Sequence, residues 1–283
     1  MLPTYLLSKF AREQITVALS GDGADEVFAG YERYLAMRLA TRFDLLPQPF
    51  RKLIFRQLAR LIPNHGERSL AGRLHRMLNL LGSPTSRRYF ELLDRCPAPI
   101  KQTLLGERLR DSLKHDSIEY FNLLQAKLTS TDRIERLTEL DLHAYLPNDI
   151  LPKVDIASMA ASLEVRSAFL DREVVEFAAK LPLEYKLFGS NRKRILKAAF
   201  SDLLPPELMD RPKKGFGVPI SLWLRNQWRR QAEAELFESK LLSENFIDSQ
   251  ALHDLWAAHQ SGRYDYGYLL WGVLILSMFI NRS

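Results

Sequence analysis

The chain has 283 residues, of which 46% are hydrophobic and 26% are charged, and its net charge is +6. A chain of this length and composition can bury the core of one large globular domain or two small ones. Its single cysteine, Cys96, excludes an internal disulfide. The first residues have neither the basic segment nor the long apolar core of a secretory signal, so the sequence predicts a cytoplasmic protein.

The first elements that the sequence predicts are a short helix over 4–13 and a strand over 15–20, "ITVALS". The strand is rich in β-branched residues, ends in a glycine-rich turn and is followed by a helix-like pattern. This βα unit is typical of an open parallel sheet, where ligands bind beyond the carboxyl ends of the strands. Because no neighbouring strand is evident, we expect the chain to be the latter part of a larger α/β domain.

The turn "SGDGADE" gathers residues that suit a nucleotide and its metal ion. Its glycines allow the backbone to approach a ligand closely, and the free amides of such a turn favour anions. Three carboxylates, Asp22, Asp25 and Glu26, would repel a bare phosphate but would suit Mg²⁺ carrying one. The alternative is that Asp22 and Asp25 only cap the helix that follows.

The region from Arg51 to Lys114 is strongly basic, with 14 Lys and Arg against 5 Asp and Glu. Such a segment could follow a nucleic-acid backbone. However, its arginines alternate with leucines at the spacing of amphipathic helices that have solvated basic faces. No nucleic-acid motif or regular aromatic spacing accompanies the charge, so we predict no nucleic-acid partner.

The rest of the chain is predicted to be mainly helical, with helices over 155–165, 172–181, 192–204 and 249–259. The apolar run over 266–280 is too short to span a membrane and is predicted to be a buried helix. Charges interrupt three segments of this part: 145–171, the basic span 192–197, and the loop "RPKKGFGVP" at 211–219. Charges within apolar stretches must pair or face a cleft, and lysines on a rigid loop suit phosphate. Each segment alone could also be a solvated face or turn.

In this order, the segments resemble the synthetase domain of the glutamine-hydrolysing asparagine synthetase family. "LSGDGADEVFAGY" is similar to its second nucleotide motif, "LPNDILPKVDIASMAASLEVRSAFLD" to its central signature, and "RPKKGFGVP" to its lysine loop. The resemblance implies a strongly helix-rich α/β fold, the carboxy-terminal portion of an adenine-nucleotide-hydrolase-like (PP-loop) domain with most sheet strands missing. It divides the chain into the end of the nucleotide-binding part (1–35), a basic helical region (36–140), and a helical part with the signature and the loop (141–283).

The family activates the side-chain carboxylate of aspartate, or another carboxylate, with ATP and Mg²⁺ to give an acyl-adenylate, which ammonia from glutamine then attacks. By resemblance, Ser20 and Gly21 would contact ATP, Asp22 would support adenylate formation, and Asp25 would bind Mg²⁺. Lys213 would be the loop lysine that stabilises charge. Asp149 and Glu164 would be acyl-site or structural carboxylates.

The chain also departs from the family pattern. Ala24, Ala29 and "SAFLD" at 167–171 are mild changes. The chain lacks the "SGGxDS" loop and the amino-terminal cysteine of the glutaminase domain, which the resemblance places upstream. We therefore expect a carboxy-terminal fragment that is inactive alone, or one subunit of a split or homo-oligomeric enzyme. A relative acting on another carboxylate and a non-catalytic fragment that binds nucleotide or partners remain the alternatives.

Overall fold

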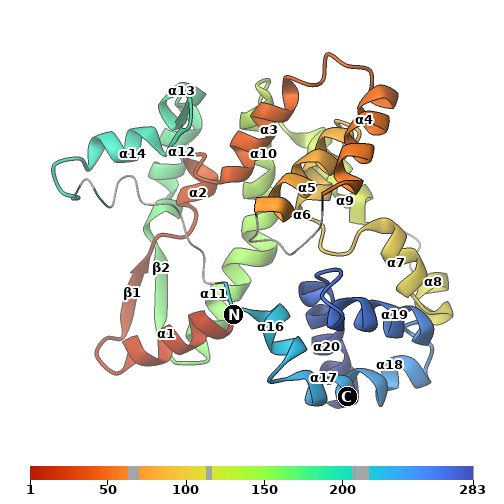
Figure 1. Cartoon of the computed structure of the whole chain (residues 1–283). Helices are drawn as coiled ribbons and strands as arrows, with labels where there is room; N and C mark the ends of the chain where they lie inside the picture. The colour runs from red at the N-terminus through yellow and green to blue at the C-terminus, as the bar shows by residue number, and fades with distance from the viewer. Residues whose placement is uncertain (63–69, 113–116, 206, 208–216, 283) are drawn as a thin grey trace. The chain divides into compact units, whose positions relative to one another are not determined.

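The computed structural model describes residues 1–62, 70–112, 117–205, 207 and 217–282. The chain folds as two compact units, each built from two stretches of sequence. The first unit contains residues 1–41 and 120–218, and the second contains residues 42–119 and 219–283. Helices dominate both units, and the strands that the described residues form all belong to the first (Figure 1).

The first unit carries a small parallel sheet among helices, which makes the chain a helix-rich α/β protein. Its elements are α1 (Leu2–Arg12), β1 (Val17–Ser20), α2 (Ala24–Val27), α3 (Glu32–Thr41), α10 (Arg133–His143), η1 (Leu146–Ile150), α11 (Leu151–Met159), β2 (Glu164–Ser167), η2 (Ala168–Leu170), α12 (Arg172–Lys180), α13 (Leu183–Lys186), β3 (Leu187–Phe188), β4 (Asn191–Arg192) and α14 (Arg194–Ala199). Helix α9 (Ser117–Lys127) leads into it from the second unit.

The strand predicted before the glycine turn is confirmed as β1, although it begins at Val17. It pairs in parallel with β2, in a register that sets Val17 against Glu164 and Ser20 against Ser167. The expectation that the chain contains no neighbouring strand is therefore wrong. The helix predicted over 155–165 overlaps the end of α11. That helix ends at Met159, and Ser162 then adopts a positive φ of 57°. A four-residue strand behind such a helix gives too short a pattern to be recognised.

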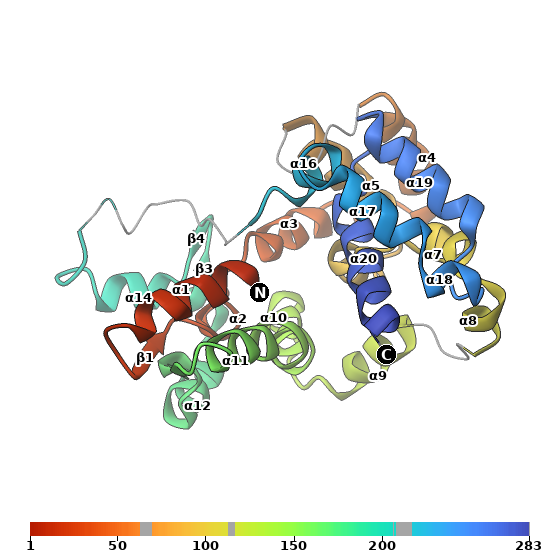
Figure 2. The same cartoon turned by 90° about the horizontal axis from the view of Figure 1, so that it is seen from below.

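Buried apolar side chains hold the βα unit in place. Val27, Phe28 and Ala178 form a buried cluster with partly buried residues of α10, α12, α14 and the η2 turn. The Asp171 carboxylate caps α12 by accepting a hydrogen bond from the Glu173 amide at 2.9 Å. This cap explains why the predicted helix begins at Arg172. Helix α1 packs along α11, and the two lie side by side in Figures 1 and 2.

The small sheet leaves apolar side chains exposed. Leu19 of β1 is 77% exposed, and Val17 on the same face is 43% exposed. The neighbouring helix α1 exposes Leu6, Leu7 and Phe10. Apart from β2, no strand of the described residues pairs with β1. The first unit therefore presents an unpaired strand edge beside an apolar surface.

Helices are the main elements of the second unit, and an isolated antiparallel bridge joins Leu105 to Ile247. Its elements are α4 (Gln48–Arg60), α5 (Leu70–Gly82), α6 (Arg88–Leu93), α7 (Ala98–Leu104), α8 (Glu107–Ser112), α16 (Ile220–Arg225), α17 (Arg229–Phe237), α18 (Lys240–Ser243), α19 (Ser249–Gln260) and α20 (Gly267–Arg282). The predicted helices over 249–259 and 266–280 are confirmed as α19 and α20. However, α20 is buried along one face only, since Leu270 and Leu274 are buried whereas Phe279 is 70% exposed. Within the described part of the chain, we find no helix with the length and apolar character that crossing a membrane requires.

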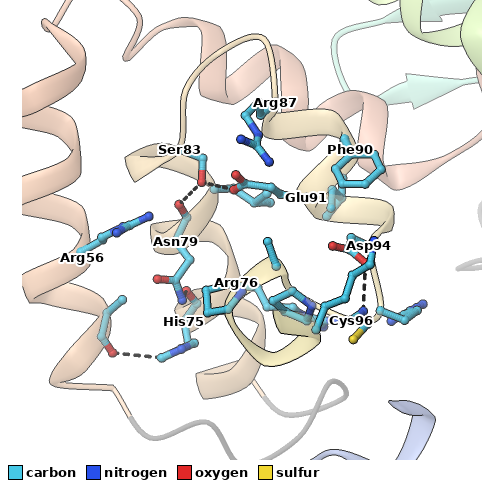
Figure 3. A pocket seen from close by; sticks show the side chains of 18 of the residues that line it. Arg56, His75, Arg76, Asn79, Ser83, Arg87, Phe90, Glu91, Asp94 and Cys96 are labelled. Carbon is cyan, nitrogen blue, oxygen red and sulfur yellow. Dashed lines mark hydrogen bonds between the residues drawn. The ribbon is translucent and has the colours of Figure 1, made fainter. Parts of the chain in front are cut away.

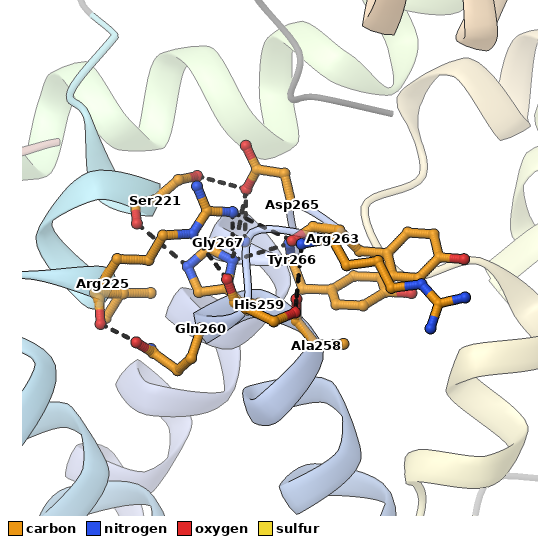
Figure 4. A network of polar contacts seen from close by, with 12 residues as sticks. Ser221, Arg225, Ala258, His259, Gln260, Arg263, Asp265, Tyr266 and Gly267 are labelled. Atoms are coloured by element: carbon orange, nitrogen blue, oxygen red, sulfur yellow. Dashed lines mark hydrogen bonds and ion pairs between the residues drawn. The ribbon is translucent and has the colours of Figure 1, made fainter. Parts of the chain in front are cut away.

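A buried histidine joins α16, α19 and the start of α20 (Figure 4). The His259 side chain is completely buried, its Nε2 lies 3.2 Å from the Ser221 carbonyl oxygen, and its Nδ1 accepts a hydrogen bond from the Tyr266 amide. Burial, followed by the charge of Arg225, lowers the pKa of His259. An unprotonated ring is also the form that can accept from the Tyr266 amide.

Two arginines of the basic region are buried, which contrasts with the solvated faces that its sequence suggests. Arg51 and Arg88 are 3% and 2% exposed, and both pair with Asp44, at 2.5 and 2.8 Å. Burial acts to raise the pKa of Asp44, but the hydrogen bond and charge of Arg88 and the charge of Arg51 outweigh it, so the pKa is lowered. Part of the positive charge in this region therefore serves helix packing.

Candidate functional site

The carboxyl ends of β1 and β2 bring serine hydroxyls to the glycine turn. The Ser20 hydroxyl donates to the Asp22 carboxylate at 2.8 Å and lies 3.2 Å from the Ser167 hydroxyl. Ser20 and Ser167 are register partners, which explains why two residues so distant in sequence meet. A Cβ atom at Gly21 would meet no atom within 4 Å, so the backbone there is open to a ligand. This end of the sheet combines hydroxyls, a carboxylate and an accessible backbone.

The other carboxylates of the turn point to partners inside the unit. Asp25 lies 2.9 Å from the Lys193 ammonium, which sits at the amino end of α14. Glu26 is only 1% exposed and accepts a hydrogen bond from the Tyr31 hydroxyl at 2.6 Å. Burial raises the pKa of Glu26. The N-cap residue of α2 is Gly23, with a φ of 85°, so neither Asp22 nor Asp25 occupies the N-cap position that the capping alternative requires.

A second buried carboxylate, Asp141 of α10, anchors α3 behind the turn. It accepts hydrogen bonds from Arg33 at 2.8 Å and from the Tyr34 hydroxyl at 2.5 Å. The Arg33 guanidinium also lies over the rings of Tyr31 and Tyr145, at 3.8 and 4.4 Å from their centres. Cation–π contacts of this kind hold the guanidinium against the rings without a further charged group. The turn therefore rests on a network of ionic and aromatic contacts.

The two weaker candidates, Glu164 and Asp149, belong to β2 and η1. Glu164 begins β2, whereas Ser167 ends it; at about 3.3 Å per residue, Glu164 is roughly 10 Å from that end. Its carboxylate accepts from Arg166 at 2.7 Å, and both side chains are exposed. Asp149 is exposed on η1 beside Tyr145; burial first, and then its charge, raises the pKa of that tyrosine. The strand register thus sets Ser20 with Ser167 beside Gly21 and Asp22, and it places Glu164 at the opposite end of β2.

Two residues near the turn, Ser167 and Lys193, are not predicted as site residues from the sequence. Ser167 belongs to the strand that was not predicted, and Lys193 is one of four basic residues in a short span. A polar residue at the end of a second parallel strand would have been the signal for Ser167. No local signal distinguishes Lys193 from its basic neighbours. Lys213 lies outside the described residues.

A pocket of about 590 Å³ opens in the second unit (Figure 3). The Ser83 hydroxyl there donates to the Asn79 carbonyl and to Glu91, and the Asp94 carboxylate accepts from the Cys96 amide. Burial raises the pKa of the Cys96 thiol, which disfavours the reactive thiolate. None of the predicted site residues in the described part of the chain lines the pocket. Its charged lining comprises Arg56, Arg60, Arg76, Arg87, Glu91, Asp94, Arg95 and Lys101.

Comparison with known proteins gives a consistent result over the whole chain. The family model described as "Asparagine synthase" matches residues 1–281. The asparagine synthetase (glutamine-hydrolyzing) 1 of Bacillus subtilis (strain 168) is 28% identical over 98% of this chain. A Mycobacterium bovis protein whose name assigns it provisionally as an asparagine synthetase (glutamine-hydrolyzing) is 32% identical over 100% of the chain. In both cases the match spans 42% of the relative's own length.

Proposed function

Because the chain belongs to the asparagine synthase family, we propose that it supplies the carboxy-terminal part of an ATP-dependent amide-forming synthetase. In this proposal a carboxylate oxygen of aspartate attacks the α-phosphorus of ATP. The bond to the β-phosphate breaks, and pyrophosphate leaves. Ammonia derived from glutamine then attacks the acyl carbon, and AMP leaves as the amide forms.

The observation that carries the proposal is the gathering of Ser20, Gly21 and Asp22 at the carboxyl end of the parallel pair β1 and β2. This is where nucleotides bind in open α/β sheets. We assign Ser20 and Gly21 to ATP, because the Gly21 backbone has no neighbour that a Cβ would meet within 4 Å. Asp22, held by the Ser20 hydroxyl at 2.8 Å, is assigned to adenylate formation. The assignment of the domain to the PP-loop fold belongs to the same proposal.

The lysine loop completes the set of residues. Negative charge develops on the phosphoryl oxygens during adenylation, and a cation held on a rigid loop stabilises it. Lys213 is proposed for this role from its motif alone, because it lies outside the described residues. Asp149 remains a weaker candidate for the carboxylate-binding site, and the exposed pair of Glu164 with Arg166 supports a structural role for Glu164.

The Mg²⁺ assignment of Asp25 agrees less well with the residues around it. The described residues contain no group of three His, Cys, Asp or Glu side chains that could hold a metal ion. The Asp25 carboxylate already faces an ammonium at 2.9 Å. Mg²⁺ carried by ATP takes one or two protein carboxylates besides the phosphates, so Asp25 would hold the ion only together with the nucleotide. No step of the proposed reaction is routed through the ion.

The relatives are more than twice as long as this chain, which supports a need for further parts. We propose that these parts supply the phosphate loop, the remaining strands and the glutaminase, either upstream in a longer chain or as a split subunit. The unpaired edge of β1 and the exposed side chains of Val17 and Leu19 support this assignment. The proposal that further parts complete the protein is also compatible with a homo-oligomer of the completed protein.

The decisive experiment reconstitutes the chain with a separately produced upstream segment and measures pyrophosphate release. We expect release that depends on both parts, on ATP and on aspartate. Release with a different carboxylate would reassign the substrate. Nucleotide binding without any release would identify a non-catalytic fragment instead.

A variant pair tests the loop lysine in the same assembly. Lys213→Ala is expected to lower the rate of pyrophosphate release at saturating ATP by about 10²-fold, whereas the adjacent Lys214→Ala should have little effect. Near-parental turnover in both variants, or loss in Lys214→Ala alone, would show that the loop lysine is assigned incorrectly.

A further inference from the structure

The pocket in the second unit has no part in the proposed synthetase reaction, because none of the described residues assigned to that reaction lines it. Its lining comes mainly from α4, α5, α6 and α7 and from the residues that flank α6, all within the stretch 42–119 of one unit. Its volume of about 590 Å³ lies within the range of roughly 300–1,000 Å³ that is typical of small-molecule sites. A pocket of this size suits a compact ligand.

The lining of this pocket is strongly basic. Six arginine or lysine side chains line it, against two carboxylates, Glu91 and Asp94. The Ser83 hydroxyl donates to Glu91, and Asp94 accepts from the Cys96 amide at 2.9 Å, so both carboxylates already have protein partners. Charges of one sign that gather in a concave surface raise the local concentration of counter-ions. The excess of positive charge therefore favours an anion that carries more than one negative charge.

Two arginines reach into the pocket from different elements (Figure 3). Arg56 belongs to α4, and its stem lies against Gly82 of α5, where a Cβ atom would be 3.4 Å from the Arg56 Cγ. Arg87 is the N-cap residue of α6. Both residues are exposed, unlike the buried arginines that pair with Asp44. An anion held by both would accept paired hydrogen bonds from two planar guanidinium groups, a geometry that suits phosphate.

The pocket also contains a histidine and apolar side chains. The His75 Nδ1 lies 2.9 and 3.0 Å from the carbonyl oxygens of Ala59 and Ile62, so this nitrogen carries the proton. The other ring nitrogen is then an acceptor in the neutral ring and a donor in the charged ring. Leu80 and Phe90 contribute apolar surface to the lining. An apolar or ring-shaped group attached to a phosphate could pack against this surface.

We propose that this pocket binds a small molecule that carries a pyrophosphate or another polyvalent phosphate group, with Arg56 and Arg87 as its principal ligands. Five of the six cations are arginines, which favours the paired recognition of phosphate oxygens over a single point charge. A single-stranded nucleic acid would instead need a basic groove with aromatic side chains along it. The pocket belongs to the second unit, whereas the residues assigned to the synthetase reaction belong to the first, so its test is independent of that function.

Calorimetric titration of the isolated full chain with pyrophosphate, at physiological ionic strength, measures the binding. Arg56→Gln and Arg87→Gln should each raise the dissociation constant on the order of 10-fold, because each removes hydrogen bonds between charged groups. Arg56→Lys, which keeps the charge but not the planar fork, should raise it less than Arg56→Gln. Arg73→Gln is the matched control with little expected effect, because Arg73 is an exposed residue of α5 that does not line the pocket.

The single cysteine shows where the anion binds. Cys96 lines the pocket and the chain has no other cysteine, so alkylation by a neutral maleimide reports on this pocket alone. The alkylation rate should fall as pyrophosphate is added, with the midpoint that calorimetry gives, and Arg87→Gln should shift that midpoint. A rate that pyrophosphate leaves unchanged would place any binding elsewhere and overturn the proposal.

Three other results would also overturn it. Equal weakening by Arg73→Gln would show diffuse attraction to a basic surface. Citrate that binds as tightly as pyrophosphate would assign the pocket to carboxylates, and an oligonucleotide that binds more tightly, with the same dependence on Arg87, would assign it to nucleic acid. Circular dichroism of each variant checks the fold; if Arg56→Gln does not fold, Arg87→Gln and the alkylation midpoint decide the question.

Discussion

Two glycines near the acidic turn should respond differently to the same methyl group. At Gly30 the added carbon would overlap Asp25 and Lys193, so Gly30→Ala is expected to cost about 1–3 kcal/mol of unfolding free energy. At Gly21 it would meet no atom within 4 Å, so Gly21→Ala should stay within about 0.5 kcal/mol. Urea unfolding of both variants measures the difference. Equal losses would contradict the packing described around Gly30.

His259 should make the chain less stable in mild acid. Burial lowers its pKa in the folded state below the ordinary value of 6.5, so the unfolded chain binds the extra proton more readily. The contribution of this histidine is therefore fully present above about pH 6.5 and is lost as the pH falls through the lower folded pKa. Unfolding free energies between pH 7.5 and 5 should decline accordingly.

The matching control uses two histidine variants. In His259→Asn the unfolding free energy should fall less between pH 7.5 and 5, because the group that titrates is gone. In His143→Asn, at an exposed residue of α10, the fall should be the same as in the parent chain. An unchanged pH dependence in His259→Asn would show that other groups cause the decline.

At the scale of elements, the contact between α3 and α10 depends on one buried carboxylate. Asp141 is fully buried and accepts from Arg33 and Tyr34, and the Arg33 side chain is only 14% exposed. Asp141→Ala should cost about 3–5 kcal/mol of unfolding free energy, because it leaves a buried arginine without its counter-charge. Chemical denaturation measures the loss.

An exposed pair on α12 provides the comparison. Arg172 and Glu176 are four residues apart and mostly solvated, so Glu176→Ala should cost no more than about 0.5 kcal/mol. A small loss in Asp141→Ala, similar to that of Glu176→Ala, would contradict the role of Asp141 as the anchor of α3.

For the whole molecule, the exposed face of β1 should matter only in the assembly. Leu19 is 77% exposed, so Leu19→Ser is expected to change the stability of the isolated chain by less than about 0.5 kcal/mol. If the upstream segment covers this face, the same change should weaken its binding to the chain about 10-fold or more, measured by calorimetry. Leu45→Ser, at a leucine 92% exposed in the second unit, is the control. Equal binding by both variants would place the upstream segment elsewhere.

Local patterns were sufficient for the elements that are long or sharply bounded. The helices over 172–181, 249–259 and 266–280 and the strand before the glycine turn follow from apolar spacing and from caps such as Asp171. The strand β2 could not be predicted in this way, because four residues behind a helix carry too little periodicity. The division of the chain into two units, each assembled from two separate stretches, also has no local signature.

The sequence by itself determined which chemistry the turn can offer, because the glycines, hydroxyl and carboxylates of "SGDGADE" are adjacent in the chain. Only the tertiary structure decided how they are partnered: Ser20 with Ser167 through the strand register, and Asp25 with Lys193 over Gly30. The physical reason is that residue types and spacing specify local geometry, whereas an ion pair or a strand partner far along the chain depends on how the whole unit packs.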